Sequence, residues 1–484
     1  MKPVNRSLFS YLRETAEQCP EKRLLSDGER WLHASETLEI AARIAATLHE
    51  MGIQRGDAVA FRCKRTVGAA LMIFGLRTAG AFVLLMDPRQ EVSETLAATE
   101  TPISARFWIE QESDTAFLVT SCESDAVSCR LSLFSLPSAL WNHSDTSGDY
   151  PAFVIFTSGT TGKCKAVVLS DSNLVNNLLD SHPLGDYRQE DLALCALPLH
   201  HVFGLVLLAG IAVLGYGMCI PAETDVESLL AVIARQRLTR MNGVPSLYQA
   251  LAAKCDAYDI SSMRSGFIGG SPMTEKQYTD TENKLGMTLI PVYGMSECIG
   301  ISCGSVAMPL SLRAHSVGRF YPMNSGKILR EDGTEAELME EGEICVTGPA
   351  RMLGYYGQMM PRDELLHTGD MGYVDADGYL YVIGRKKNII IRNGNNLSPR
   401  RIEEALLALP GIREAVVVGL QDEQQGEVPA AMLVADSETA APEPKLNKNE
   451  LPVCYHYVDA IPLTASGKPD LLRIREVLTR CRNG

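Results

Sequence analysis

The segment TSGTTGKCK, residues 157–165, places hydroxyls, glycines and two lysines directly after an apolar run. Such a loop can direct backbone N–H groups, hydroxyls and an ammonium at a polyphosphate. Its expected phosphate-binding residues are Thr157, Ser158, Gly159, Thr160, Thr161, Gly162, Lys163 and Lys165. The segment is not a Walker A loop, because only two residues separate Gly159 from Gly162 and Cys164 follows Lys163. A lone Ser/Gly/Lys turn is more often a solvated loop, so the functional interpretation needs residues elsewhere.

Six further segments carry side chains that could complete such a site. They are LPLHHVFG (197–204), GGSP (269–272), YGMSE (293–297), HTGD (367–370), GYLYVIGRKKN (378–388) and PLTASGK (462–468). Carboxylates in them could bind a hard cation or accept hydrogen bonds from hydroxyls, and their Arg and Lys side chains could neutralise phosphate. Taken singly, each segment has an ordinary structural explanation, such as a turn, a helix start or a surface charge.

Together and in this order, the seven segments resemble the ANL superfamily of adenylate-forming enzymes, which comprises acyl-CoA synthetases, peptide-synthetase adenylation domains and firefly luciferases. The similarity spans essentially the whole chain. It implies that ATP and Mg²⁺ convert a carboxylic acid to an acyl adenylate with release of pyrophosphate, and that a thiol then displaces AMP. The implied thiol is coenzyme A as co-substrate, or alternatively the phosphopantetheine arm of an acyl or peptidyl carrier protein.

The resemblance also implies roles at the phosphates. The loop 157–165 would hold the β- and γ-phosphates, and Ser296, where the family usually has Thr, would hydrogen-bond the α-phosphate. Glu297 would hold Mg²⁺, since a hard cation prefers oxygen ligands. Lys468 would reach the attacking carboxylate and the α-phosphate and neutralise the charge that develops there.

Five matching residues would contact the nucleoside. Tyr293 would flank the adenine, and Gly269 and Gly270 would let the backbone approach the base. Asp370 would accept hydrogen bonds from the ribose hydroxyls, and Arg385 would complete that contact.

Two further positions match moving or gating parts of the family. The small C-terminal domain reorients between the two steps, about a hinge that maps to Lys387. His201 matches an aromatic or imidazole position near the acyl and thiol channel. A gating role and a buried, hydrogen-bonded histidine are equally good interpretations of it.

The substrate is only partly indicated. Amino-acid-activating members carry an Asp in the segment that corresponds to LPLHHVFG, and no acidic residue occurs there, which favours a carboxylic acid without an α-ammonium group. The segment 389–404 resembles that of acyl- and aryl-CoA ligases. A degenerate, non-catalytic nucleotide-binding protein is disfavoured because Glu297, Asp370, Arg385 and Lys468 are all present.

The sequence departs from the family pattern at three places. Cys164 and Ala166 stand where Pro and Gly are common, and Ile391 stands where some relatives carry a Lys used in the second half-reaction. The segment between residues 434 and 462 is shorter than usual, and residues 436–450 read as a polar loop in place of a helix.

The elements around these segments alternate between helical and strand patterns. Residues 38–48 have helical periodicity, while 58–63 and 81–86 read as strands, a rhythm typical of α/β architecture. Beyond Ser398-Pro399 the sequence predicts a short helix followed by two strands. We expect a large N-terminal α/β domain of several subdomains over residues 1–385. A small mobile α+β domain over 386–484 would carry Lys468.

The stretch 201–220 is mostly apolar and long enough in principle to cross a bilayer. Pro198, His200 and His201 open the stretch, and Gly215 and Gly217 interrupt it. These residues, and the lack of flanking aromatic or basic belts, favour a buried helix that ends near Gly215 and precedes a buried strand. We therefore expect no membrane span.

Charge and cysteine usage narrow the possible partners. The 484 residues contain 45 Lys and Arg against 59 Asp and Glu, a net charge of −14, which argues against a general nucleic-acid binder. The 13 cysteines lack metal-type CxxC pairs and indicate a reducing compartment. No leader or lipidation motif is evident, so the expected location is the cytoplasm.

Overall fold

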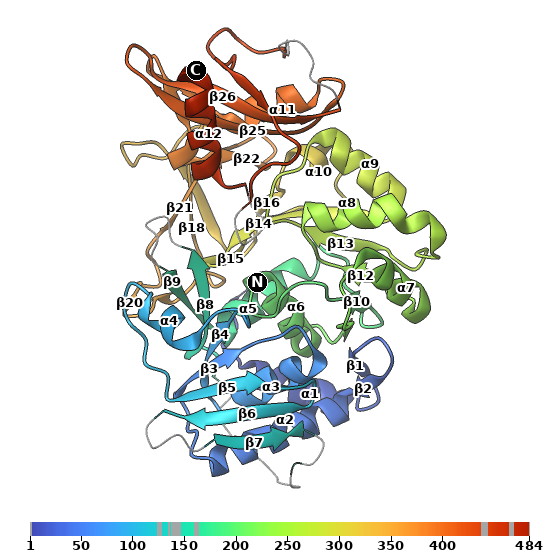
Figure 1. Ribbon diagram of the computed structural model, residues 1–484. Coiled ribbons are helices and arrows are strands. Elements are labelled where there is room, and N and C mark those ends of the chain that lie inside the picture. Colours follow the sequence, from blue (N-terminus) through green and yellow to red (C-terminus); the bar gives the residue numbers. More distant parts are fainter. Residues whose placement is uncertain are drawn as a thin grey trace. The chain divides into compact units, whose positions relative to one another are not determined.

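The computed structural model describes residues 2–122, 128–133, 136, 147–158, 164–436, 444–463 and 469–483 (Figure 1). The chain forms two compact units. The first comprises Met1–Gly326 and Val346–Leu366, and the second comprises Lys327–Cys345 and His367–Gly484. The expected boundary between residues 385 and 386 lies inside the second unit and stays a prediction.

One sheet of the first unit carries the strand that precedes the loop 157–165. Its strand order is β20-β19-β9-β8-β4-β3-β5-β6-β7. The strands are β3 (Ala58–Arg62), β4 (Phe82–Met86), β5 (Phe107–Gln111), β6 (Ala116–Ser121), β7 (Ser128–Ser132), β8 (Pro151–Ser158), β9 (Cys164–Ser170), β19 (Gly354–Tyr355) and β20 (Gln358–Met359). β3, β4, β5 and β8 are parallel, and β9 runs antiparallel to β8. The strands expected at 58–63 and 81–86 are thus confirmed as β3 and β4.

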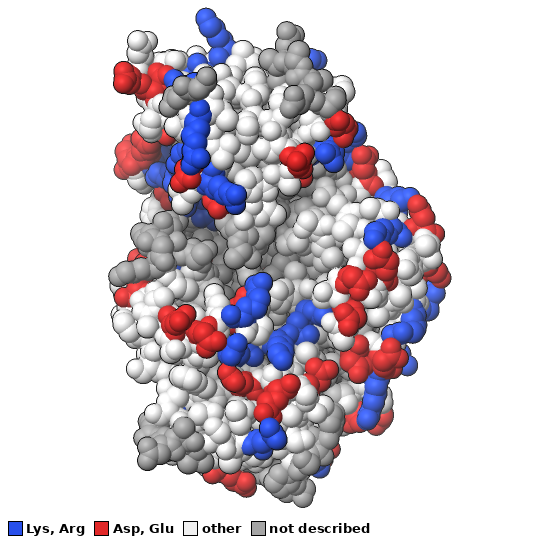
Figure 2. All heavy atoms as spheres, viewed as in Figure 1, with Lys and Arg blue, Asp and Glu red and all other residues white. Residues whose placement is uncertain are grey.

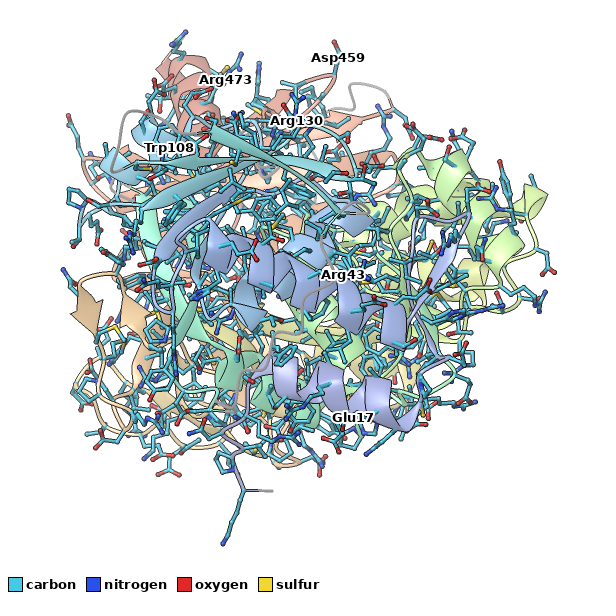
Figure 3. The ribbon with its side chains drawn as sticks, turned by 90° about the horizontal axis from the view of Figure 1, so that it is seen from below. Glu17, Arg43, Trp108, Arg130, Asp459 and Arg473 are labelled. Carbon is cyan, nitrogen blue, oxygen red and sulfur yellow. The ribbon has the colours of Figure 1, made fainter. Side chains whose placement is uncertain are left out.

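Helices α1 (Leu8–Gln18), α2 (Ala34–Glu50) and α3 (Val67–Thr78) pack against one another. Figure 3 shows α1 and α2 side by side, with Glu17 and Arg43 labelled on them, and Trp108 and Arg130 on the strands of the sheet. α3 is buried on all sides because its residues are almost entirely apolar, so it lies between the other helices and the sheet. The helix expected over 38–48 lies within α2.

The second sheet of this unit has the order β16-β15-β14-β13-β12-β10-β11-β1-β2. Its strands are β1 (Arg23–Ser26), β2 (Trp31–His33), β10 (Leu192–Leu194), β11 (Gly217–Cys219), β12 (Arg240–Met241), β13 (Ser265–Ile268), β14 (Thr288–Met295), β15 (Cys298–Cys303) and β16 (Arg319–Phe320). The pairs from β11 through β14 are parallel, so the carboxyl ends of these strands meet at one edge. The remaining helices of the unit are α4 (Val92–Ala97), α5 (Asp171–Ser181), α6 (Val202–Val213), α7 (Val226–Gln236), α8 (Pro245–Lys254), α9 (Glu275–Leu285) and α10 (Leu310–His315).

The apolar stretch 201–220 forms a buried helix and a buried strand. α6 contains 12 residues and is almost completely covered, and β11 follows with all three residues buried. Gly215 turns the chain between them with a φ of 71°, a left-handed conformation that favours glycine. Among the described residues, no helix is both long and apolar enough to cross a membrane.

Helices α7 to α9 present both signs of charge to solvent (Figure 2). Lys254 pairs with Glu227, and the Nζ of Lys284 lies 2.6 Å from the Oδ1 of Asp256. Opposite charges therefore alternate over this surface, which does not form the basic face that a polyanion partner requires.

The second unit contains two sheets. One has the order β17-β18-β21-β22 and the other β24-β23-β26-β25, with β27 paired to β26. The elements are β17 (Ser325–Leu329), β18 (Gly342–Thr347), β21 (Leu366–Val374), β22 (Leu380–Arg385), the 3₁₀ turn η3 (Lys386–Asn388), β23 (Ile390–Arg392), β24 (Asn395–Leu397), α11 (Pro399–Leu407), β25 (Ile412–Asp422), β26 (Gly426–Ala435), β27 (Tyr455–Tyr457) and α12 (Leu471–Asn483).

The β25–β26 pair is covered by a helix on each face. Ile402 of α11 packs with Val417 and Leu433, whereas Ile474 of α12 packs with Val416 and Met432. Successive residues of a strand point to opposite faces of the sheet. A strand whose residues are all apolar must therefore be covered on both faces. The helix and two strands expected after Ser398 are confirmed, and Ser398 accepts a capping hydrogen bond from the Arg401 N–H.

Candidate nucleotide and metal site

The hairpin between β14 and β15 presents Ser296 and Glu297. Met295 pairs with Cys298, so these two residues form the turn itself. Gly294 precedes it, and a Cβ at this position would lie 2.2 Å from the Ile299 carbonyl oxygen. The YGMSE segment therefore forms a tight hairpin end and not a helix start, and only glycine fits at its second position.

Glu297 is a buried carboxylate whose position is fixed by a hydrogen bond. Its exposed fraction is 9%, and its Oε1 accepts a hydrogen bond of 2.9 Å from the Tyr355 hydroxyl. None of the ion pairs between described residues involves Glu297. A buried carboxylate needs a compensating positive charge, so the Glu297 oxygens suit a hard divalent cation such as Mg²⁺.

Tyr355 links this carboxylate to the strand that follows the loop 157–165. β19 pairs antiparallel with β9, with Tyr355 opposite Val167, and the Lys165 Nζ lies 4.7 Å from the centre of the Tyr355 ring. Burial and the Glu297 charge both raise the pKa of Tyr355, so the phenol stays protonated and donates its hydrogen bond. The GYYG sequence around Tyr355 did not reveal this role, because nothing local places it beside Glu297.

The base of the loop 157–165 is a β-ladder. Thr157 pairs with Lys165, the backbone of Ser158 pairs with Cys164, and the Cys164 thiol donates to the Thr157 carbonyl at 3.4 Å. Cys164, a departure from the family pattern, thus closes the loop base by a contact that proline could not make. Gly159, Thr160, Thr161, Gly162, Lys163, Lys468 and the side chain of Ser158 lie outside the described residues.

The expected adenine-side residues meet at the carboxyl edge of the parallel strands. Gly269 and Gly270 directly follow β13, and Tyr293 lies on the neighbouring strand β14. A Cβ at Gly269 would lie 2.7 Å from the Val292 carbonyl oxygen, and Gly270 has a φ of 88°. The two glycines are therefore required by the backbone itself.

Asp370 and Arg385 of the second unit form the expected pair. They are direct partners in the β21–β22 ladder, and the Arg385 Nε lies 2.7 Å from the Asp370 Oδ1. Asp370 is 6% exposed, whereas Arg385 is exposed. The carboxylate is thus held in place by a guanidinium that remains open to solvent.

The remaining two expected residues, His201 and Lys387, both lie in described parts of the chain. His201 is exposed at the N-cap of α6, so the buried-histidine interpretation is wrong. Lys387 lies in η3, where burial and then the nearby Arg385 charge lower its pKa.

A cavity of about 470 Å³ in the first unit is lined by none of the described site residues. Its lining includes Gly80, Phe82 and Pro151, at the starts of β4 and β8. The loop 157–165 follows the other end of β8, so this cavity is not the nucleotide site.

Comparison with known protein families identifies two matching families. The AMP-binding enzyme family matches residues 12–356, and the AMP-binding enzyme C-terminal domain matches residues 401–468. The chain belongs to the AMP-binding enzyme family. This membership confirms the resemblance to the ANL superfamily of adenylate-forming enzymes.

Two relatives of this chain are named as coenzyme A ligases. The chain is 36% identical over 311 residues to an acyl-CoA ligase of Ajellomyces capsulatus, a match that covers 61% of this chain and 53% of that protein. It is 28% identical over 479 residues to 2-succinylbenzoate–CoA ligase of Bacillus cereus, covering 95% and 96% of the two chains.

Solved structures share the fold of this AMP-binding enzyme. ATP-bound MatB from Rhodopseudomonas palustris superposes with a TM-score of 0.83 at 24% identity, over 98% of this chain and 99% of that one. The o-succinylbenzoate CoA synthetase of Bacillus subtilis with its acyl-adenylate intermediate gives 0.81 at 25% identity, over 98% of each.

The comparisons confirm the expected fold class, a large α/β N-terminal part with a small C-terminal domain. They also confirm the enzyme class, an AMP-forming acid–thiol ligase of the acyl-CoA synthetase type that uses ATP, Mg²⁺ and coenzyme A.

Proposed function

We propose that this protein activates a carboxylic acid without an α-ammonium group as its acyl adenylate and transfers the acyl group to coenzyme A. The absence of an acidic residue in LPLHHVFG supports this substrate class. Relatives named as acyl-CoA and 2-succinylbenzoate–CoA ligases support the acceptor. A cytoplasmic location is part of the proposal, because many of the cysteines are buried as thiols, which fits a reducing compartment.

The observation that carries the proposal is the contact series Lys165–Tyr355–Glu297. It joins the strand after the phosphate loop to a buried carboxylate without an ion-pair partner in the described chain. The ammonium of Lys165 would attract the leaving phosphates, and Glu297 would hold Mg²⁺ against them, where charge develops as pyrophosphate departs. Mg²⁺ would supply further neutralisation of phosphate charge.

The remaining residues have supporting roles in the proposed reaction. Ser296, beside Glu297 in the hairpin turn, would donate to the α-phosphate. Asp370, held by Arg385, would accept hydrogen bonds from the ribose hydroxyls. Lys468 would reach the attacking carboxylate. His201, exposed at the start of α6, would border the path of the acyl group.

ATP–pyrophosphate exchange with a panel of fatty, aryl and short carboxylic acids tests the first half-reaction. Mass spectrometry with coenzyme A added tests the second. We expect exchange with at least one acid and formation of its coenzyme A thioester. Exchange with none of the acids would contradict the proposal.

A carrier-protein phosphopantetheine is the second candidate acceptor. Ile391, where some relatives carry a Lys used in thioester formation, is 53% exposed on β23. Exchange with an acid, no coenzyme A thioester and acylation of a holo carrier protein would favour this candidate.

A further inference from the structure

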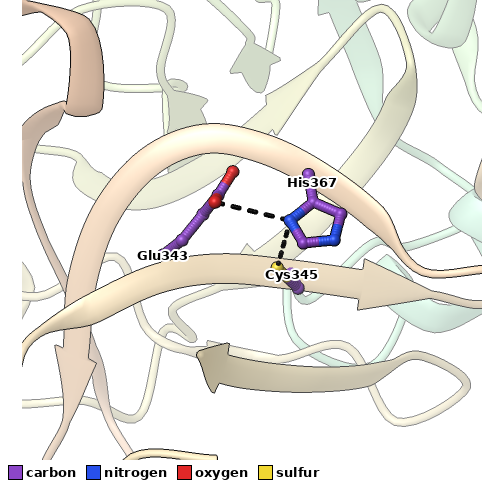
Figure 4. Close-up of side chains that lie close together, drawn as sticks. All are labelled: Glu343, Cys345 and His367. Carbon is purple, nitrogen blue, oxygen red and sulfur yellow. Dashed lines mark hydrogen bonds and ion pairs between the residues drawn. The ribbon is translucent and has the colours of Figure 1, made fainter. Parts of the chain in front are cut away.

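Three potential metal ligands of different chemistry meet on the sheet β17-β18-β21-β22 (Figure 4). Glu343 and Cys345 lie two residues apart on β18 and therefore point to the same face. His367 comes from the neighbouring strand β21. One ligand atom of each residue lies within 4.8 Å of the other two.

Two of the three distances within this triad match those between the ligands of a tetrahedral metal ion. The Cys345 Sγ lies 3.3 Å from the His367 Nδ1, and this nitrogen lies 3.4 Å from the Glu343 Oε2. A zinc ion bound at ~2.3 Å to sulfur and ~2.0–2.2 Å to nitrogen or oxygen separates neighbouring ligand atoms by roughly 3.3–3.6 Å. Cys345 and Glu343 are therefore each spaced from His367 as two ligands of one metal ion are.

The carboxylate is oriented from outside the triad. The Gly369 N–H donates to the Glu343 Oε1 at 3.2 Å, which leaves Oε2 facing His367. Such outer hydrogen bonds position metal ligands and increase affinity. The His367 side chain is 60% exposed, so an ion from solvent can reach the site.

A cation of the protein already uses the same oxygen. The Lys386 Nζ lies 3.0 Å from the Glu343 Oε2, and its side chain is 48% exposed. Solvent reaches the half-exposed lysine and weakens this ion pair, so a divalent ion that gains a thiolate and an imidazole as well can displace the ammonium.

We propose that Glu343, Cys345 and His367 bind a divalent transition metal of the zinc type, with a fourth position open to water. The thiol releases its proton to solvent when the metal binds. The site lies in the second unit, whereas Glu297 lies in the first. Its thiolate and imidazole also distinguish it from a Mg²⁺ site, because Mg²⁺ prefers oxygen ligands.

Co²⁺ titration of the full-length, reduced protein in excess Mg²⁺ tests the proposal. We expect one Co²⁺ per chain with the near-ultraviolet absorption of a cobalt–thiolate bond. Cys345→Ala and His367→Ala should each weaken binding at least about 100-fold, more than loss of an outer hydrogen bond does. Lys386→Gln should strengthen it about three- to tenfold because the competing ammonium is gone.

Cys481→Ala is the matched control. The Cys481 Sγ also lies 3.3 Å from a histidine, the Nδ1 of His456, but in the described residues no third ligand completes that pair. This variant should bind Co²⁺ at the triad as the wild type does. Equal loss in Cys481→Ala and Cys345→Ala would overturn the proposal.

Glu343→Gln is a second test variant that should still fold, since its amide oxygen can accept the hydrogen bond from the Gly369 N–H. It should weaken Co²⁺ binding at least about tenfold and remove the rise in unfolding temperature that Zn²⁺ gives the wild type. Unchanged binding in this variant and in a folded Cys345→Ala would overturn the proposal. Because the readouts are metal binding and unfolding, their failure says nothing against the ligase activity.

Discussion

At the residue scale, Tyr355 connects two groups that are far apart in the sequence. Its ring contacts the Lys165 ammonium, and its hydroxyl donates to Glu297. A protonated phenol tolerates burial next to a carboxylate because it can donate a hydrogen bond without adding charge. Tyr355 is therefore a positioning residue for the expected metal ligand.

Tyr355→Phe removes the hydrogen bond to Glu297 and keeps the ring below Lys165. We expect the KM for MgATP in pyrophosphate exchange to rise about tenfold, the size of one hydrogen bond to a charged group. Tyr356→Phe is the control, because Tyr356 instead stacks on Phe82 at 6.4 Å between ring centres. An equal change in both variants would contradict the positioning role.

Lys468→Ala removes the ammonium that the family resemblance assigns to the attacking carboxylate. The expected result is a folded protein with nearly abolished acid-dependent ATP–pyrophosphate exchange, because charge developing at the α-phosphate is no longer neutralised. Circular dichroism checks the fold. Near-normal exchange would rule out this role.

At the element scale, α5 joins the core of the first unit to the segment that leads into β19. Asn173 forms a capping box with Ser170, and its amide donates at 2.8 Å to the Pro349 and Arg351 carbonyl oxygens. The Asn173 side chain thus completes the capping box and also holds the segment that leads to Tyr355.

Asn173→Ala should lower the free energy of unfolding by about 2–4 kcal/mol, since it removes the hydrogen bond that the Asn173 Oδ1 accepts from the Ser170 N–H and leaves two carbonyls unpaired. Ser170→Ala should cost only about 1 kcal/mol, because it removes the cap alone. Urea denaturation measures both. Equal losses would show that the contacts to residues 349 and 351 contribute nothing.

Glu403 makes α11 sensitive to pH. Burial raises its pKa to about 7, although the Val417 N–H donates to it. The folded state therefore holds a proton that the unfolded state, with a pKa near ~4.3, releases at lower pH. The stability of the second unit should fall as pH rises from about 5 to about 7.

Glu403→Gln imitates the protonated acid. It should flatten this pH dependence and stabilise the protein at pH 8 by on the order of 1–3 kcal/mol. Thermal unfolding at a series of pH values measures the effect. Glu404→Gln, on the exposed face of the same helix, should leave the pH dependence intact.

Local patterns predicted these elements better than the contacts between them. The buried helix α6, the strands β3 and β4, and the Ser398 cap follow from periodicity and turn chemistry. The Asp370–Arg385 pair followed from the family motifs. Tyr355 and the Glu343–Cys345–His367 triad were missed, because pairing between distant strands brings them together and no local spacing encodes it.

At the scale of the whole molecule, the family resemblance assigns a hinge to Lys387. The C-terminal domain would turn about this hinge between the first and the second half-reaction. Lys387 is exposed in η3, and partial burial of its ammonium together with the neighbouring Arg385 charge lowers its pKa. Restricting the backbone at Lys387 should therefore impair the change from one half-reaction to the other more than it impairs substrate binding.

Lys387→Pro restricts φ at this position. We expect one half-reaction to remain near normal while the other falls by about 100-fold or more, since a fixed hinge favours one arrangement. Pyrophosphate exchange and thioester formation from isolated acyl adenylate measure the two steps separately. Equal loss of both would contradict the hinge assignment.

The path of the chain between its two units has a consequence for how the protein is made. Residues 346–366 return to the first unit only after residues 327–345 have been synthesised as part of the second. Until β19 emerges, β9 is an unprotected sheet edge, and such edges pair readily with other chains. A fragment that ends before residue 346 should therefore aggregate, and a ribosome that pauses there would expose the same edge.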